Sequence, residues 1–410
     1  MKTEDHLNTT IQTEPCQDSL ADSTSKLKVA SIFTGIAGIE RGLALAGHET
    51  EFMCEIDPGA RAVLGTHFPG MNIRRDITRV RALPKADVVA AGFPCNDLSQ
   101  VGPATGIGGT QSRLVSEVFR LVQRGRRTQP LWLLLENVPF MLRLNGGKAI
   151  RYIVSRFDEE GYRWAYRIVD TRAFGLPQRR RRVIIAASRT EDPREVLLVD
   201  EAADPPFEYS RNVACGFYWT EGNRGVGWAI DAVPTLKGSS SIGITSPPAI
   251  WMPGGEIVMP NIRDAERLQG FPPGWTLPAT QVGGMREGAR WKLVGNAVSV
   301  PVARWVGRRL VNPKPYFNDD DECLGSFRRL KSWPDAAWGE NGKVYRADIT
   351  AWPVNYRYKH LAEFLRYPSM PLRERAAAGF LNRARASTLT FVDGFLDAID
   401  AHLEMLRAAA

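Results

Sequence analysis

The chain has 410 residues, of which 44% are hydrophobic, so it can bury a sizeable core in two domains or in one large domain with an appendage. No apolar run approaches the roughly eighteen residues of a membrane span, so we expect no membrane partner. Residues 1–27 are polar and unlike a signal peptide. We therefore expect an intracellular, cytoplasmic chain with a disordered leader. The net charge of +8 favours a polyanionic partner, and five scattered cysteines without a C-x-x-C pair argue against a disulfide framework and a structural zinc site.

From Lys28 onward, short apolar segments alternate with segments of helical spacing. The predicted strands are residues 28–33, 51–55, 87–93 and 131–136, and the predicted helices are residues 38–46, 57–68 and 112–127. The last two strands are nearly all apolar, as expected for parallel strands covered on both faces. Repeated strand–helix units predict an α/β fold with a doubly wound, mostly parallel sheet and a site at the carboxyl ends of its strands.

The periodicity breaks after residue 189 and returns near residue 261. Residues 190–260 are rich in Gly, Pro, Ser and Trp, which predicts a small irregular domain inserted after the sheet. The predicted division is therefore a leader at 1–27, a catalytic domain at 28–189 and 261–311, the irregular domain at 190–260 and an extension at 312–410.

The extension is expected to be helical. Its last part has an apolar stripe at helical spacing, formed by Val392, Phe395, Leu396, Ile399, Leu403 and Leu406. Its aromatic residues, including Trp333, Trp338 and Trp352, indicate a packed segment rather than a free tail. We expect it to cap the same chain and to matter more for stability than for turnover; a second copy or an accessory subunit is the alternative partner for the stripe.

A glycine turn, Phe33-Thr34-Gly35-Ile36-Ala37-Gly38, joins the first predicted strand to the first helix. Glycines there let a ligand approach the backbone at a helix N-terminus, although a tight turn also needs glycine for structural reasons. Glu55, at the end of the second strand, can hold both hydroxyls of a ribose, and Asp76 can receive an adenine amino group. Either acid alone is equally compatible with a solvated loop; together they predict an adenosine-containing cofactor, either a dinucleotide or S-adenosylmethionine.

Two further residues follow apolar strands and can carry chemistry. Cys95 ends the sequence Gly92-Phe93-Pro94-Cys95; a buried cysteine is often only a small hydrophobe, but the glycine-rich residues 102–109 that follow are typical of a mobile lid over a nucleophile. Glu136 follows the apolar residues 131–135, so burial is expected to raise its pKa and make it a proton donor at neutral pH. The alternative for Glu136 is a capping or salt-bridging role.

A run of one glutamine and four arginines, residues 178–182, leads directly into the apolar residues 183–185. Because alternate residues of a strand share a face, one face is predicted to carry Gln178, Arg180 and Arg182. The other face is predicted to carry Arg179 and Arg181, and an ordinary solvated basic run would rarely lead straight into a buried strand.

The ordered series of motifs resembles that of the cytosine-5 DNA methyltransferase family, in its unpermuted prokaryotic form. The resembling segments are residues 33–38 (cofactor loop), Pro94-Cys95 (nucleophile motif), Glu136-Asn137-Val138 (E-N-V motif), 178–182 (Q-x-R-x-R motif), 263–272 (the structural motif after the recognition domain) and 295–299 (the last motif). The likeness covers about residues 27–310. The chain departs from the family pattern at Ala37, where a glycine is common, at Asn96 and Leu98, and at residues 110–112, so contacts of the lid to DNA are not carried over.

The resemblance implies a DNA (cytosine-5-)-methyltransferase of Rossmann-like fold that uses S-adenosylmethionine and no metal. It implies that Cys95 adds to carbon 6 of a flipped-out cytosine, that Glu136 holds or protonates N3 and that Arg182 binds O2, while Arg180 supports the nucleophile loop. The implied cofactor-binding residues are Phe33, Gly35, Gly38, Glu55, Asp76, Asn296 and Val298.

The implied partner is duplex DNA, read by residues 190–260 as a target-recognition domain with a short T-L element at Thr235-Leu236. The candidate base-contacting residues are Arg211, Asn212, Asn223, Arg224 and Lys237. We expect a monomer that is associated with the nucleoid. It is expected to act in a restriction-modification system or as an orphan modification enzyme. If a cognate restriction endonuclease exists, we expect no stable complex with it.

Three alternatives stay open at this point. The same chemistry can act on tRNA, whose loops offer bases without flipping from a duplex. A catalytically silent DNA-binding protein of the same fold is a second alternative, although Cys95, Glu136 and Arg182 are all present. A NAD-dependent oxidoreductase would explain the glycine turn and Glu55 but not Pro94-Cys95 with Glu136.

Overall fold

The computed structural model describes residues 26–93, 112–124, 130–238, 247–283, 288–317 and 320–409. Cys95 and the glycine-rich residues 102–109, on which two of the predictions rest, lie outside these ranges. Among the residues that are described, no helix is both long and apolar enough to cross a membrane.

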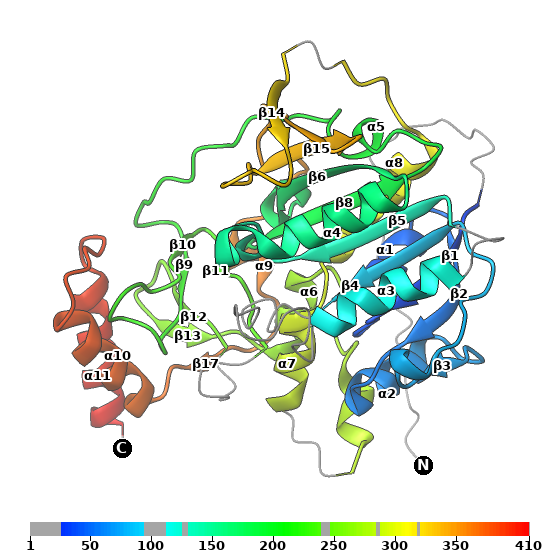
Figure 1. Cartoon of the computed structure of the whole chain (residues 1–410). Helices are drawn as coiled ribbons and strands as arrows, with labels where there is room; N and C mark the ends of the chain where they lie inside the picture. The colour runs from blue at the N-terminus through cyan, green and yellow to red at the C-terminus, as the bar shows by residue number, and fades with distance from the viewer. Residues whose placement is uncertain are drawn as a thin grey trace, which may run out of the picture.

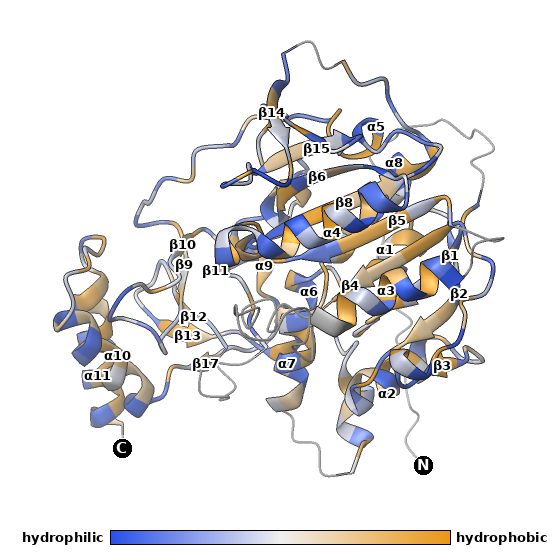
Figure 2. Ribbon diagram, in the orientation of Figure 1, coloured by the Kyte–Doolittle hydropathy of each residue, from blue (hydrophilic) through white to orange (hydrophobic). Residues whose placement is uncertain are grey.

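One large sheet organises the molecule, with the strand order β14-β16-β15-β6-β8-β5-β4-β1-β2-β3 (Figure 1). Its parallel part consists of β3 (Ile73–Arg74), β2 (Glu49–Cys54), β1 (Lys28–Ile32), β4 (Val88–Gly92) and β5 (Trp132–Asn137). Side chains alternate along these strands between two cores: Val89 belongs to one core and Ala90 to the other. Both faces of the sheet are therefore apolar, as Figure 2 shows along β1, β4 and β5.

Helices cover both faces of this sheet. The first core contains α3 (Ser112–Arg124) and α4 (Lys148–Glu159), and the second contains α1 (Gly38–Ala44), α5 (Arg194–Leu197) and α8 (Val300–Val311). The other helices around the catalytic part are α2 (Pro58–His67), α6 (Ile262–Leu268), α7 (Gly288–Asn296) and the 3-10 turns η1 (Ile77–Arg79), η3 (Pro139–Leu142), η4 (Leu144–Gly146), η5 (Thr171–Phe174) and η6 (Leu277–Gln281). This arrangement confirms the predicted doubly wound α/β architecture.

The sheet is mixed rather than mostly parallel. Beyond β5, all neighbours are antiparallel: β8 (Arg181–Ser188), β6 (Arg163–Asp170), β15 (Ala336–Glu340), β16 (Lys343–Arg346) and β14 (Glu322–Ser326). The connections explain the difference, because only ten residues separate β6 from β8, and a parallel neighbour needs a crossover of a dozen or more residues.

A second, five-stranded sheet lies within and beyond the predicted irregular domain, in the order β10-β9-β12-β13-β17. Its strands are β10 (Ala229–Ile230), β9 (Cys215–Phe217), β12 (Ala249–Trp251), β13 (Ile257–Met259) and β17 (Met370–Pro371). A two-stranded pairing of β11 (Val233–Pro234) with β7 (Gln178–Arg179) joins this region to the catalytic part.

The C-terminal segment contributes strands as well as the predicted helices. Strands β14 to β16 extend the main sheet past β6, and β17 pairs with β13. The helices are α9 (Leu361–Phe364), α10 (Glu374–Arg385) and α11 (Phe395–Ala408). The apolar stripe of α11 packs against α10 and the five-stranded sheet, so its partner surface belongs to the same chain, as expected.

We predict that deleting residues 314–410 prevents folding, a larger effect than the sequence alone suggested. The deletion removes Trp333, Trp338 and Trp352, each at most 5% exposed, and uncovers β6. Truncating one buried tryptophan typically costs about 3–5 kcal/mol, against a total stability of about 5–15 kcal/mol. We expect the truncated chain in the insoluble fraction, whereas Trp338→Ala alone stays soluble with a lowered melting temperature. A soluble truncation with a cooperative thermal transition would contradict this prediction.

Candidate active site

The predicted site residues lie along one edge of the main sheet. Each lies at or just beyond the carboxyl end of its strand: Glu136 is the last residue but one of β5, Phe33 follows β1, Glu55 follows β2 and Asp76 lies two residues after β3. Strand β4, between β5 and β1, ends at Gly92, which leads to Pro94-Cys95. Arg182 is near the amino end of β8, which is antiparallel to β5, and therefore lies at the same edge. The strand order thus brings together residues that are far apart in the sequence.

The glycine turn after β1 is held by Glu55. The backbone has positive φ at Phe33 (59°), Gly35 (58°) and Ala37 (70°). The Gly35 N–H donates to one carboxylate oxygen of Glu55 at 2.7 Å, and the Asp57 N–H donates to the other at 2.8 Å. Burial raises the pKa of Glu55, and these backbone donors oppose the rise. No atom lies within 4 Å of the position that a Cβ would take on Gly35, so the turn leaves space beside its backbone.

Ala37, where the family commonly has glycine, points away from that space. Its methyl group is fully buried in a small core with Met53 and Leu64. The left-handed backbone at this position explains why glycine is common here, because a Cβ makes that conformation unfavourable by roughly 1–2 kcal/mol. The Ala37 methyl group therefore packs in this small core beside the turn.

Two neighbouring residues complete the side of the site near Glu55. Ile56 is 72% exposed, which is unusual for a large apolar residue between an acidic pair, and sequence reasoning missed it. Its carbonyl oxygen accepts a hydrogen bond from the Arg61 guanidinium. Asp76 accepts hydrogen bonds from the hydroxyl and the N–H of Thr78, which lower the pKa of its carboxyl group.

The last motif packs directly on the glycine turn. A Cβ on Gly38 would lie 2.1 Å from the Val298 carbonyl oxygen, so only glycine allows this approach. Gly295 is similarly pressed against the backbone of Lys237, and the side chain of Asn296 lies beside Gly238. The structure therefore brings Val298 to the turn and places Asn296 next to the segment that follows the T-L element.

Glu136 is buried and paired. It is 8% exposed, and its carboxylate lies 3.0 Å from Nε of Arg182. Burial raises the pKa of Glu136, while the charges of Arg182 and then Arg180 oppose the rise. Its other carboxylate oxygen is 3.5 Å from the position of a Cβ on Gly92. This is a desolvated carboxyl group beside one cation, which is the environment expected for a group that exchanges a proton or a strong hydrogen bond with a ligand.

Asn137 links Glu136 to the segment that leads to Cys95. Its amide nitrogen donates to the Phe93 carbonyl oxygen at 3.2 Å, and its amide oxygen accepts from the Val138 N–H at 2.8 Å. Phe93 is two residues before Cys95, which itself lies outside the described residues. The E-N-V motif contained this signal, but sequence reasoning assigned no role to its asparagine.

The run at residues 178–182 has the predicted alternation. Gln178 and Arg180 are buried and Arg182 is partly buried, whereas Arg179 and Arg181 are exposed. Arg180 donates to the carbonyl oxygens of Leu236, Gly295 and Ala297 at 3.0, 3.1 and 2.7 Å. Among the described residues Arg180 therefore ties the T-L element to the last motif. The nucleophile loop, which it was predicted to support, lies outside the described residues.

Gln178 acts at the same junction. Its side-chain amide donates to the Leu268 carbonyl oxygen at 2.7 Å, and its amide oxygen accepts from the Leu236 N–H at 3.1 Å. Arg180 and Gln178 are thus positioning residues for the neighbouring segments.

Trp275 is a second residue that sequence reasoning missed. Its indole N–H donates to the Ile36 carbonyl oxygen in the glycine turn at 2.9 Å. The ring is stacked on His67 with a centroid distance of 3.5 Å, and the Arg41 guanidinium lies 4.9 Å from its centroid. A residue 239 positions away thus fixes the turn, and no local pattern announces it.

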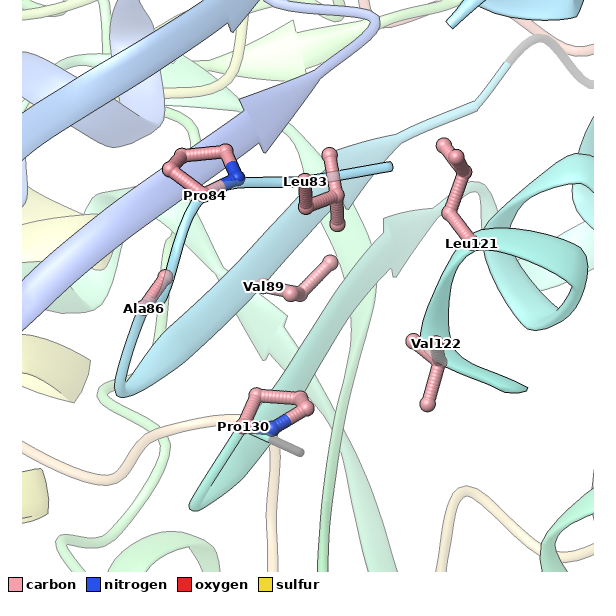
Figure 3. Close-up of a pocket in the computed structure, with 7 residues that line it drawn as sticks. All are labelled: Leu83, Pro84, Ala86, Val89, Leu121, Val122 and Pro130. Atoms are coloured by element: carbon pink, nitrogen blue, oxygen red, sulfur yellow. The ribbon is translucent and has the colours of Figure 1, made fainter. Parts of the chain in front are cut away.

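An apolar pocket at the other end of the strands is not part of this site. Figure 3 shows its lining, formed by Leu83, Pro84, Ala86, Val89, Leu121, Val122 and Pro130. Ala86 and Pro130 precede β4 and β5, so the pocket lies at the amino ends of these strands. Its free volume of about 10 Å³ is sufficient for one water molecule and too small for a nucleoside.

Comparison with known proteins identifies the family. Residues 27–214 match the family described as C-5 cytosine-specific DNA methylase. The Type II methyltransferase M2.BsuMI of Bacillus subtilis strain 168 is 50% identical over 383 residues, which cover 91% of this chain and 97% of that protein. The chain belongs to the C-5 cytosine-specific DNA methylase family.

This C-5 cytosine methylase is thus an enzyme of DNA methylation, as the motifs predicted. The Type II methyltransferase M.MspI of Moraxella sp. is 33% identical over 167 residues, covering 40% of this chain and 39% of that protein. The crystal structure of the Dnmt2 methyltransferase of S. pombe superposes on 70% of this chain and 99% of that chain, with a TM-score of 0.52 and 16% sequence identity. This likeness supports the fold. The alignment with M2.BsuMI covers 91% of this methylase. The uncovered 9% is much shorter than residues 312–410, so the alignment must include most of that segment.

Proposed function

We propose that this methylase transfers a methyl group from S-adenosylmethionine to carbon 5 of a flipped-out cytosine in a specific duplex DNA sequence, through a covalent adduct of Cys95. The observation that carries the proposal is the buried Glu136–Arg182 pair at the edge of the sheet where Phe93 leads to Pro94-Cys95. A carboxyl group and a guanidinium at 3.0 Å can together recognise N3 and O2 of one cytosine ring.

The edge of the sheet beside Glu55 fits an adenosine-containing cofactor. The Glu55 carboxylate is fixed by two backbone N–H groups and suits a ribose, and the exposed Ile56 offers an apolar surface to an adenine ring. The open space beside the Gly35 backbone suits the rest of the molecule. When bound, S-adenosylmethionine supplies an electrophilic methyl group.

Carbon 5 of cytosine is a poor nucleophile, so the chain must activate the ring. The Cys95 thiolate adds to carbon 6, and the electron pair of the 5,6 double bond becomes available at carbon 5. Glu136 stabilises the ring by a hydrogen bond or a proton at N3, and Arg182 binds O2 as negative charge develops there. After methylation, loss of the carbon-5 proton to a base and expulsion of the thiolate restore the double bond.

The target base must leave the duplex, at a cost of a few kcal/mol, because stacking shields carbon 6. We assign reading of the surrounding sequence to residues 190–260, and the names of the relatives M2.BsuMI and M.MspI favour a place in a type II restriction-modification system. S-adenosylmethionine is the only cofactor in this proposal, and duplex DNA is the partner.

The test is transfer of tritiated methyl groups to duplex DNA and to tRNA, followed by bisulfite sequencing of plasmid DNA from cells that express the protein. We expect label in DNA only and a single methylated sequence context. Label in tRNA alone would contradict the proposal, and absence of 5-methylcytosine from both substrates would favour the catalytically silent alternative.

We predict that Trp275→Phe weakens S-adenosylmethionine binding about three- to tenfold, the loss expected for one hydrogen bond. The substitution keeps an aromatic ring against His67 but removes the donor to the Ile36 carbonyl oxygen. Calorimetric titration measures the change. Trp305→Phe is the control, because its indole N–H donates to Asp200 at 2.9 Å on the α8 side of the sheet. Equal dissociation constants for the two variants would show that the Trp275 hydrogen bond does not position the turn for the cofactor.

A further inference from the structure

The loop of residues 218–227 links β9 to β10 and carries two polar residues at its tip. Asn223 and Arg224 are exposed, while Gly222 between them and the stem is buried. An asparagine and an arginine are the side chains that pair in bidentate fashion with adenine and guanine in the major groove. The tip therefore has the chemistry of a base-reading element.

The stem of the 218–227 loop is held by a residue of the C-terminal segment. Arg383 of α10 donates from Nη2 to the Trp219 carbonyl oxygen at 2.7 Å and from Nε to the Glu221 carbonyl oxygen at 3.0 Å. Gly222 has φ of +125°, and a Cβ there would lie 3.2 Å from Cβ of Arg383. The loop is thus in close contact with Arg383 of helix α10 at three residues, Trp219, Glu221 and Gly222.

The helices α10 and α11 form the other side of the core beneath this loop. Phe217, at the end of β9, packs its ring against Phe380 of α10 and Phe395 of α11, with centroids 5.0 and 4.9 Å apart. In Figure 1 the two helices lie beside β9, β12 and β13, on the side away from the main sheet. The last strand of this sheet, β17, also comes from the C-terminal segment.

The same loop is connected to the active site through the T-L element. The Glu221 carboxylate pairs with the Lys237 ammonium group, which lies 3.9 Å from the ring centroid of Tyr218. The Tyr218 hydroxyl donates to the Thr235 carbonyl oxygen. Arg180 in turn donates to the Leu236 carbonyl oxygen, so a series of direct contacts links the loop stem to the T-L element and the last motif.

We propose that Asn223 and Arg224 determine sequence specificity and that Arg383, in the C-terminal segment, is the positioning residue that aims them at the DNA. This inference rests on the proposed methylation of duplex DNA. Base-edge hydrogen bonds are directional, so a tip on an unsupported loop would discriminate poorly between base pairs. The recognition domain is accordingly built from two separate parts of the chain, residues 190–260 and the helices α10 and α11.

The experiment compares Arg383→Met, Arg383→Lys, the double variant Asn223→Ala/Arg224→Ala and the control Arg385→Met. Arg385 lies two residues further along α10 and pairs with Asp400 of α11 rather than with the loop. For each full-length variant, kcat and KM are measured on the target duplex and on duplexes in which one base pair of the target is changed. The enzyme concentration used is that of the molecules able to bind S-adenosylhomocysteine. Discrimination is the value of kcat/KM on the target duplex divided by the value of kcat/KM on the changed duplex.

We expect Arg383→Met and the double variant each to lose about tenfold in discrimination at one or two base pairs, the size expected for one directed base contact. Arg383→Met should raise KM for DNA with kcat within about twofold, Arg383→Lys should recover part of the loss, and Arg385→Met should behave as the wild type. A merely structural role of Arg383 would lower the active fraction without changing these ratios, and that result overturns the positioning role.

Wild-type discrimination by the double variant overturns the specificity assignment. Its two residues are exposed, so this arm decides even if Arg383→Met fails to fold. Failure of the wild-type protein to methylate any duplex would instead refute the proposed function and is recognised before the variants are compared.

Discussion

We expect that replacing Cys95 with alanine abolishes methyl transfer and prevents a covalent adduct with DNA. Duplex DNA with 5-fluorocytosine at the target position should trap the wild-type protein, because fluorine cannot leave carbon 5 as a proton does. Without the thiolate, carbon 5 stays a poor nucleophile, and we expect no activity above background. The adduct is measured as a shifted band on a denaturing gel after incubation with S-adenosylmethionine.

The three cysteines that the structure describes make this a sharp test. Burial raises the pKa of the Cys54 and Cys215 thiols to about 12, so neither forms an appreciable thiolate at neutral pH. Cys323 is exposed on β14, and Cys323→Ala is therefore the matched control that should keep both activity and adduct. An adduct formed equally well by Cys95→Ala would rule out the assignment of the nucleophile.

We expect that replacing Glu136 with glutamine lowers kcat by roughly 10²- to 10⁴-fold, the usual contribution of a positioned proton donor. Glutamine keeps the size of the side chain but cannot give a proton to N3 or balance the charge of Arg182, which lies 3.0 Å away. Burial raises the pKa of Glu136, so the wild-type group retains its proton to higher pH than an ordinary glutamate. Single-turnover methylation at saturating DNA measures the chemical step.

Cofactor affinity should change little in Glu136→Gln, since the residues expected to hold the cofactor are at the ends of β1, β2 and β3. Glu117→Gln is the matched control, because Glu117 pairs with Arg120 within α3. If the single-turnover rate of Glu136→Gln stays within about fivefold of that of the control, Glu136 has no part in the chemical step.

The sequence by itself predicted the α/β fold of the catalytic part and indicated the candidate residues of its site. Glu55 and Asp76 were together predicted to indicate an adenosine-containing cofactor, and Glu136 was predicted separately as a proton donor. All three lie at one edge of the sheet because the carboxyl ends of parallel strands meet there. The alternation of Gln178, Arg180 and Arg182 was equally readable, since strand geometry alone sets which side chains share a face. These inferences depend on local spacing, which a sequence displays directly.

Only the tertiary structure decided how the C-terminal segment is used. The strands β14 to β17 have two to five residues each, too few for a clear period. They join the two sheets through β15, which pairs with β6, and β17, which pairs with β13, and both partners are far away in the sequence. The same holds for single hydrogen bonds, such as those from Trp275 to Ile36 and from Arg383 to Glu221, which join residues 239 and 162 positions apart. Contacts of this kind depend on how whole elements pack against one another, and no periodic pattern in the sequence marks such single contacts.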